Sequence, residues 1–138
     1  MTPLIAAAGW GMRAGSPRFN PTAKDAQDRS IATLELLWAA GAGANGGVNA
    51  RVTDVKSRTA RMGRGGTLPE RGGQTALFGA VHWAWPRVAQ YLVDHGAEVA
   101  VMDDHRVSPL DAALGRAGSA DNRPSAEVAK ILQTAIGQ

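Results

Sequence analysis

Gln74-Thr75-Ala76-Leu77, followed by Ala80, returns 33 positions later as Val107-Ser108-Pro109-Leu110, followed by Ala113. Between the two copies runs Val88-Ala89-Gln90-Tyr91-Leu92-Val93-Asp94-His95-Gly96-Ala97, an apolar stripe of helical spacing that ends on a glycine. A third copy opens the chain as Thr2-Pro3-Leu4 with Ala7, and Leu36-Leu37 precede Gly41-Ala42 in the same way. A period of this length predicts a repeat architecture.

Each copy predicts a pair of helices. The Thr or Ser hydroxyl caps the free backbone N–H groups of the first helix, and Pro3 and Pro109 occupy a position where a missing N–H is tolerated. The second helices align in rows: Thr33 with Val88 and Val128, Leu34 with Ala89 and Ala129, Leu36 with Tyr91 and Ile131, and Leu37 with Leu92 and Leu132. We interpret these stripes as core packing, with Gly41 and Gly96 in the left-handed conformation that ends a helix.

The residue pattern and its period resemble the ankyrin repeat over nearly all 138 residues. The resemblance implies an all-α repeat: an ankyrin-like solenoid of helix-turn-helix units joined by hairpin fingers, here with two long loop insertions. We expect a single domain over residues 1–138, with units at about 1–54, 72–104 and 105–138 and insertions at about 12–29 and 51–72. Terminal repeats need a polar outer face, so the bare Met1-Thr2-Pro3 start leads us to expect either a longer parent chain or a partner on the first unit.

The sequence departs from the family pattern at five places. The histidine that usually follows Thr-Pro-Leu is replaced by Ile5, Phe78 and Asp111. Ala84 stands where a glycine usually ends the first helix, and Arg106 replaces the usual finger glycine. We expect locally altered turns at Ala84 and Arg106.

The resemblance implies that a protein partner binds the concave surface of first helices and fingers. The position eight residues after each Thr/Ser holds Trp10, Trp83 and Arg116, residue types that are enriched at binding hot spots; the alternative is that the tryptophans pack beneath the insertions. We also predict that the variable positions of the fingers and the residue that precedes Trp83 contact the partner. The further predicted contact residues are Arg71, Gln74, His82, Asp104, His105 and Val107.

The first insertion-bearing finger is basic. Residues 51–71 hold six Lys/Arg against Asp54 and Glu70, and this excess exceeds the net charge of +3 for the whole chain. The Arg-Gly-Gly triplets at Arg64 and Arg71 resemble RNA-binding tails, but aromatic residues to stack on bases are missing. The second hypothesis is therefore an anion-binding adaptor, for nucleic acid or an acidic lipid surface, that uses Arg58, Arg61 and Arg64; nucleic acid is the less favoured ligand.

Other classes of function find little support. The chain has no cysteine, and Asp103-Asp104-His105 has no further ligand nearby in sequence, so we expect no metal or other cofactor. Neither a nucleophile elbow, a His-Glu-x-x-His helix nor a phosphate loop is present, so we expect no enzymatic activity. No apolar run is long enough to span a membrane and none reads as a signal peptide. We expect a soluble cytoplasmic or periplasmic protein, an accessory subunit of a larger complex, with a bacterial-type composition.

Overall fold

A computed structural model describes residues 2–9, 24–52, 72–104, 106–115 and 125–137. Their elements are, in chain order, α1 (Pro3–Ala7), α2 (Ala26–Ala39), the 3-10 helix η1 (Ala44–Asn49), α4 (Ala76–His82), α5 (Pro86–Asp94), α6 (Pro109–Ala113) and α7 (Ala126–Ile136). Within these ranges the structure is helical and contains no strand. The fold of these ranges is therefore of the all-α class that the repeated sequence motif predicts.

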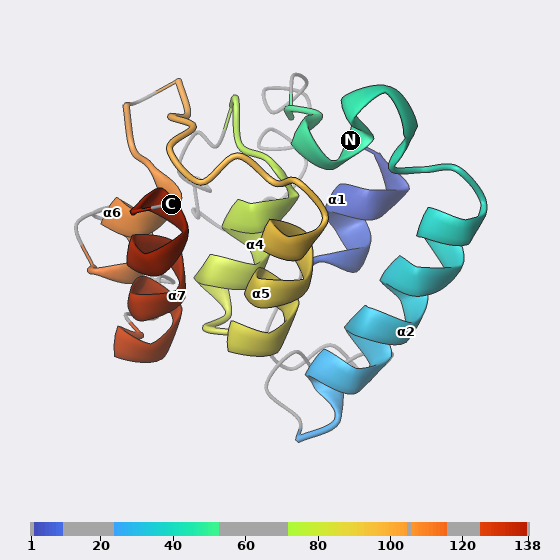
Figure 1. Cartoon of the computed structure of the whole chain (residues 1–138), viewed down its shortest axis with the longest axis horizontal. Helices are drawn as coiled ribbons and strands as arrows, with labels where there is room; N and C mark the ends of the chain where they lie inside the picture. The colour runs from blue at the N-terminus through green and yellow to red at the C-terminus, as the bar shows by residue number, and fades with distance from the viewer. Residues whose placement is uncertain (1, 10–23, 53–71, 105, 116–124, 138) are drawn as a thin grey trace, which may run out of the picture.

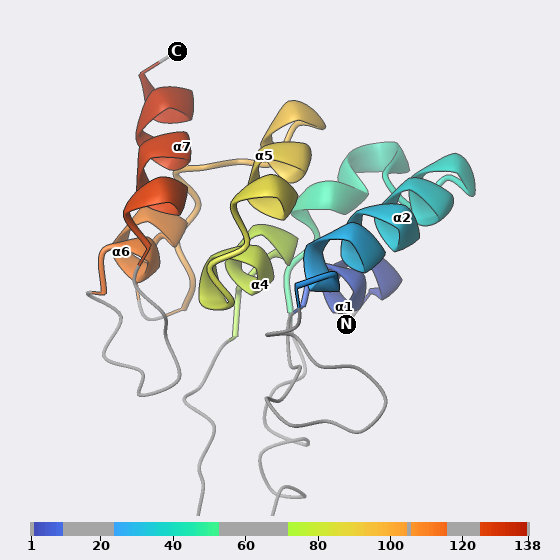
Figure 2. The same ribbon diagram turned by 90° about the horizontal axis from the view of Figure 1, so that it is seen from below.

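The helices pair and the pairs stack. Each first helix packs against its own second helix, as α1 does with α2, α4 with α5, and α6 with α7. The first helices also contact one another along a row α1–α4–α6, and the second helices along a row α2–α5–α7. Figure 2 shows the two rows as two layers. The three helices of the second row run in the same direction (Figure 1).

The core lies between the two layers. Leu4, Leu34, Leu77, Leu92 and Leu132, one from each of five helices, are almost fully buried. Small residues let the layers approach closely, since Ala76, Ala80, Ala89 and Ala113 are buried as well. Apolar burial of this kind is the main stabilising term in folding.

The first helices begin at side-chain caps. Thr2 Oγ1 accepts a hydrogen bond from Ile5 N, and Ser108 with Asp111 forms a reciprocal capping box. Asp111, which replaces the family histidine, thus bonds back to the capping residue. At the equivalent position α4 has Phe78, and Thr75 makes no side-chain cap bond. The three first helices therefore begin at the same position through different chemistry.

The turns after the helices keep one geometry. Gly41 and Gly96 have φ of 91° and 92°, and the residue after each donates its N–H to the carbonyl five residues earlier, Leu37 and Leu92 respectively. This is the capping geometry that the sequence predicts. Ala84 adopts the same conformation at φ 56° and Arg106 at φ 61°. The expectation of altered turns was wrong: the left-handed turn persists without glycine, although a side chain strains it.

α2 starts earlier than the repeat pattern indicates. The insertion expected at residues 12–29 would end just before Ser30, yet α2 begins at Ala26. Ala26 and Ser30 are buried, and Ser30 Oγ donates to Ala7 O at 2.6 Å. One residue of the expected apolar stripe is not buried. Leu36, which aligns with the half-buried Tyr91, is 73% exposed.

Candidate partner-binding site

The base of the first finger is closed by two backbone hydrogen bonds. Val52 N donates to Gln74 O and Gly73 N donates to Val52 O, both at 2.8 Å. Gly73 has φ 82°, a conformation that favours glycine, and a Cβ there would lie 2.6 Å from an Asp104 oxygen. The two ends of the basic segment are thus held side by side against the next finger.

Asp103 organises the second finger. Its backbone N–H donates to Val107 O at 2.9 Å, and its Oδ1 accepts from Val107 N at 3.0 Å. The side chain is buried, and Oδ2 accepts a 3.3 Å hydrogen bond from Gln74 Nε2. Asp103 therefore braces the turn of the second finger through both its backbone and its side chain.

Further bonds tie the two fingers together. Asp104 N donates to Gly72 O at 2.9 Å. The Asn49 side chain donates to Gly96 O at 3.1 Å and accepts from Glu98 N at 2.8 Å. Short hydrogen bonds from side chains to backbone hold loops in one arrangement, so the finger bases form a fixed platform.

Side chains alternate along the extended part of the second finger. Val99, Val101 and Asp103 turn toward the protein, whereas the intervening side chains are exposed. Met102 is 51% exposed. The exposed set, which we call the finger row, comprises Glu98, Ala100, Met102, Asp104 and Arg106. A flexible apolar side chain in a row that also carries acidic and basic side chains suits contact with another protein.

The predicted contact residues separate into three groups. Asp104 is exposed in the finger row, whereas Gln74 is engaged with Asp103 and Val107 is half-buried against the core. Trp10, Arg71, His105 and Arg116 lie outside the described residues, as do the predicted anion-binding residues Arg58, Arg61 and Arg64. Met102 was missed, because only the finger's in-and-out alternation would have indicated its exposure.

Trp83 is a packing residue in this structure. It is 7% exposed, and its indole N–H donates to Gly9 O at 2.9 Å, which joins α4 to the end of α1. His82 lies edge-on to its ring at 5.0 Å. These contacts make Trp83 part of the packing between α4 and the end of α1.

The predicted ladder of Trp10, Trp83 and Arg116 does not share one turn position. Trp10 and Arg116 follow the left-handed residues Gly9 and Gly115, whereas Trp83 precedes the left-handed residue Ala84. The reason is that α1 and α6 have five residues and α4 has seven. In register with the turn, the middle residue is Trp85, which is also buried.

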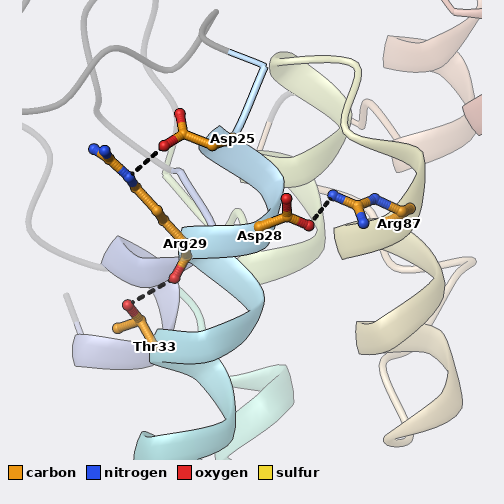
Figure 3. Close-up of polar contacts among 5 residues, drawn as sticks. All are labelled: Asp25, Asp28, Arg29, Thr33 and Arg87. Carbon is orange, nitrogen blue, oxygen red and sulfur yellow. Dashed lines mark hydrogen bonds and ion pairs between the residues drawn. The ribbon is translucent and has the colours of Figure 1, made fainter.

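A polar junction connects the second helices at their first turns (Figure 3). The Arg87 guanidinium pairs with Asp28, and Arg87 N donates to Gln27 Oε1 at 2.9 Å. Gln27 thereby satisfies a free N–H at the start of α5, where Trp85 supplies no side-chain cap. Asp25, the residue before α2, forms a further ion pair with Arg29 at 2.8 Å. Both ion pairs are exposed and contribute little to stability.

The last turns of the same helices meet through aromatic rings. His95 stacks on Tyr91 with ring centroids 4.0 Å apart and lies edge-on to Trp38 at 4.7 Å. Burial, with a smaller effect from the Glu35 carboxylate, raises the pKa of Tyr91 above its ordinary value of 10.0. Position and packing make this cluster part of the α2–α5 contact.

The described ranges contain neither a cluster of metal-binding side chains nor a membrane-spanning helix. No three His, Asp or Glu side chains there are grouped as a metal ion would require. Nor does that part of the chain contain a helix of the length and apolarity needed to cross a bilayer.

Comparison with known proteins gives one family match. Residues 72–104 match the family model of the ankyrin repeat. The matched stretch comprises α4, α5 and the second finger up to Asp104. No curated protein and no solved structure matches the chain.

Proposed function

Since residues 72–104 make this chain an ankyrin-repeat protein, we propose that it is a protein–protein interaction module that docks its partner through the finger row and the first-helix side. Ankyrin repeats act in general as non-enzymatic interaction modules. We further propose that three stacked units, at about 1–54, 72–104 and 105–138, form a short solenoid that serves as an accessory subunit within a larger assembly.

The platform of cross-linked finger bases supports this proposal best. Both fingers are held by the hydrogen bonds of Asp103, Asn49 and the Gly72 carbonyl. The exposed Met102 and Asp104 are therefore presented in a fixed position. A pre-organised surface loses less conformational entropy when it binds. The exposed apolar side chain and the charges around it match the mixed character of protein interfaces.

The test is native purification at low and high salt, with the co-purifying species identified by mass spectrometry. The finger variant combines Met102→Glu with Asp104→Asn. The matched control combines Ile136→Glu with Asp94→Asn, which likewise replace an exposed apolar residue by Glu and an exposed Asp by Asn, in the second-helix layer. A stoichiometric protein that survives high salt, is retained by the control and is lost from the finger variant is the expected result. A partner retained equally by both variants contradicts this location.

The second candidate is the anion-binding adaptor, and charge distribution favours it. The described residues hold six Lys/Arg against nine Asp/Glu, whereas the rest of the chain holds nine against three. Binding by the basic segment would fall steeply with salt, because each phosphate contact releases counterions. Replacing Arg58, Arg61 and Arg64 by Ser should then abolish binding to RNA or to vesicles of anionic lipid. Unchanged binding would remove this candidate.

A further inference from the structure

The second finger turns sharply between Asp103 and Val107. Asp103 N donates to Val107 O at 2.9 Å, and Arg106 N donates to Asp103 O at 3.0 Å. Arg106, the last residue before Val107, has φ 61°. Hairpin loops of three residues end in this left-handed conformation, which glycine adopts most readily. An arginine side chain at this position therefore strains the turn.

Ala84 is the other residue with a side chain and a positive φ in the described ranges, and its surroundings differ. Ala84, at φ 56°, is half-buried and stands between Trp83 and Trp85, which are both buried. Arg106 is exposed. Packing of the two tryptophans accompanies the strained turn at Ala84, whereas Arg106 strains a turn at the surface of the protein.

The exposed arginines differ in whether they are paired. Arg29 and Arg87 each form an ion pair with an aspartate. The side chains of Arg51 and Arg106 are exposed and form no ion pair within the described part of the chain. Of these two, only Arg106 has a positive φ. Arg106 therefore combines a strained backbone with an unpaired cation.

Asp104 does not neutralise Arg106, although the two residues stand two positions apart in the finger row. The Asp104 carboxylate lies against the base of the first finger, where a Cβ added at Gly73 would be 2.6 Å from its Oδ1. The Asp104 N–H also donates to Gly72 O at 2.9 Å. The carboxylate is thus held toward the first finger, and the Arg106 guanidinium is left available to another molecule.

We propose that Arg106 is the residue by which the finger row selects its partner, and that it binds a carboxylate of that partner. The inference rests on the proposed function, in which the finger row docks a protein, and it names the chemistry that the row recognises. A guanidinium presents parallel N–H groups that match the two oxygens of a carboxylate. The strained turn is then explained, because glycine would relax it but carries no such group.

Met102 supplies the second part of the recognised feature. Met102 and Arg106 each precede one of the two residues that pair across the hairpin, Asp103 and Val107, so both lie next to its closed end. Met102 is 51% exposed, and its flexible thioether adapts to apolar surfaces of different shape. The partner segment that fits is therefore an Asp or Glu with an apolar residue close to it.

The test selects ligands from a displayed library of random peptides. The library is selected in parallel on the natural chain, on the Arg106→Gly variant and on the Arg106→Glu variant. We expect the natural chain to enrich Asp or Glu close to an apolar residue and Arg106→Gly to lose the acidic preference. Arg106→Glu should enrich Lys or Arg instead. A reversal of the selected charge would assign recognition to position 106.

Affinity and stability are then compared with a peptide that the natural chain selects. Arg106→Gly should weaken binding by about tenfold or more, because a charge-assisted pair is lost. It should also raise the midpoint of thermal unfolding by about 2–4 °C, because the turn relaxes. Ala84→Gly is the matched control. It relaxes the same conformation beyond the C-terminal end of α4, whereas the fingers adjoin the N-terminal end, so affinity should stay within about twofold.

An equal acidic preference in the natural chain and the Arg106→Gly variant overturns the inference, as does unchanged affinity. If Met102→Glu abolishes peptide binding and Arg106→Gly does not, the finger row remains the docking site and only the role of Arg106 is wrong. A natural chain that enriches no peptide also overturns the inference, whereas the proposed function is decided by its own co-purification test.

Discussion

The middle helix pair and the first helix pair share one pattern but differ in how much of it is buried. Leu92 in α5 is fully buried, whereas Leu37, at the same position in α2, is only half-buried. Among the described helices, others pack on both sides of α4 and α5, whereas α2 contacts a neighbour of its own row on one side. Equivalent residues in a repeat therefore contribute unequally, and their neighbours decide how much.

The largest expected effect separates these two leucines. Leu92→Ala should lower the free energy of unfolding by about 3–4 kcal/mol, because a fully buried leucine leaves a cavity, and Leu37→Ala by about 1 kcal/mol. Equilibrium unfolding in urea measures both. Leu36→Ala, at the exposed neighbour, is the control with a change below about 0.5 kcal/mol. Equal losses at Leu92 and Leu37 would contradict the comparison.

The turn glycines Gly9 and Gly41 differ in how closely neighbouring atoms approach them. Gly9 and Gly41 both have positive φ, at 98° and 91°, but a Cβ at Gly9 would lie 2.7 Å from the Trp85 ring, while none of the described atoms approaches one at Gly41 within 4 Å. Gly41→Ala should cost about 1 kcal/mol through backbone strain alone. Gly9→Ala should cost about 2–3 kcal/mol, because overpacking adds to the strain. Thermal unfolding followed by circular dichroism tests the order, which a larger loss at Gly41 would reverse.

A gain in stability is expected at Ala84. Its φ of 56° strains a residue with a side chain, so Ala84→Gly should raise the free energy of unfolding by about 0.5–1 kcal/mol, after the entropy that glycine adds to the unfolded chain is subtracted. Ala80→Gly, in the interior of α4, should lower it by about 1 kcal/mol. Urea unfolding compares the two variants. If Ala84→Gly also lowers the free energy of unfolding, the turn at Ala84 is not strained.

The smallest effect concerns the aromatic contact between α2 and α5. Tyr91 is the only tyrosine, so its ionisation can be followed by absorbance. Its pKa is raised by burial and by Glu35, so the folded state holds the proton more tightly. This contribution to stability is present below the ordinary pKa of 10.0 and is lost as the pH rises through the folded-state value. We expect a titration midpoint above 10.0 that Glu35→Gln moves slightly downward, while Glu127→Gln leaves it unchanged.

Local chemistry made the helix pairs and their turns predictable. The caps at Thr2 and Ser108 and the turns at Gly41 and Gly96 each act within a few residues, and the structure has them where the pattern indicates. Thr75 makes no cap bond, and Leu36 in the apolar rows is exposed. The early start of α2 had a local signal as well, because Asp25 and Arg29 are spaced to pair on a helix.

The candidate site was less predictable because it depends on distant neighbours. Trp83 is buried through its contact with Gly9, 74 residues away, and no local pattern contains this contact. Met102 is exposed where Val101 and Asp103 turn inward, and Asp103 accepts a hydrogen bond from Gln74, 29 residues away in the other finger. The exposure of Leu36 follows from the absence of a covering helix among the described residues and not from its own sequence environment.

The hydrogen bond from Trp83 to Gly9 has a consequence for the order of folding. The middle and last pairs are joined by the short second finger, whereas α1 reaches α4 only after a loop of more than 60 residues has closed. Loop closure opposes contacts between distant residues, and such contacts form slowly. We therefore expect α4–α7 to assemble first and to provide the template on which α1 and α2 dock in a later kinetic step.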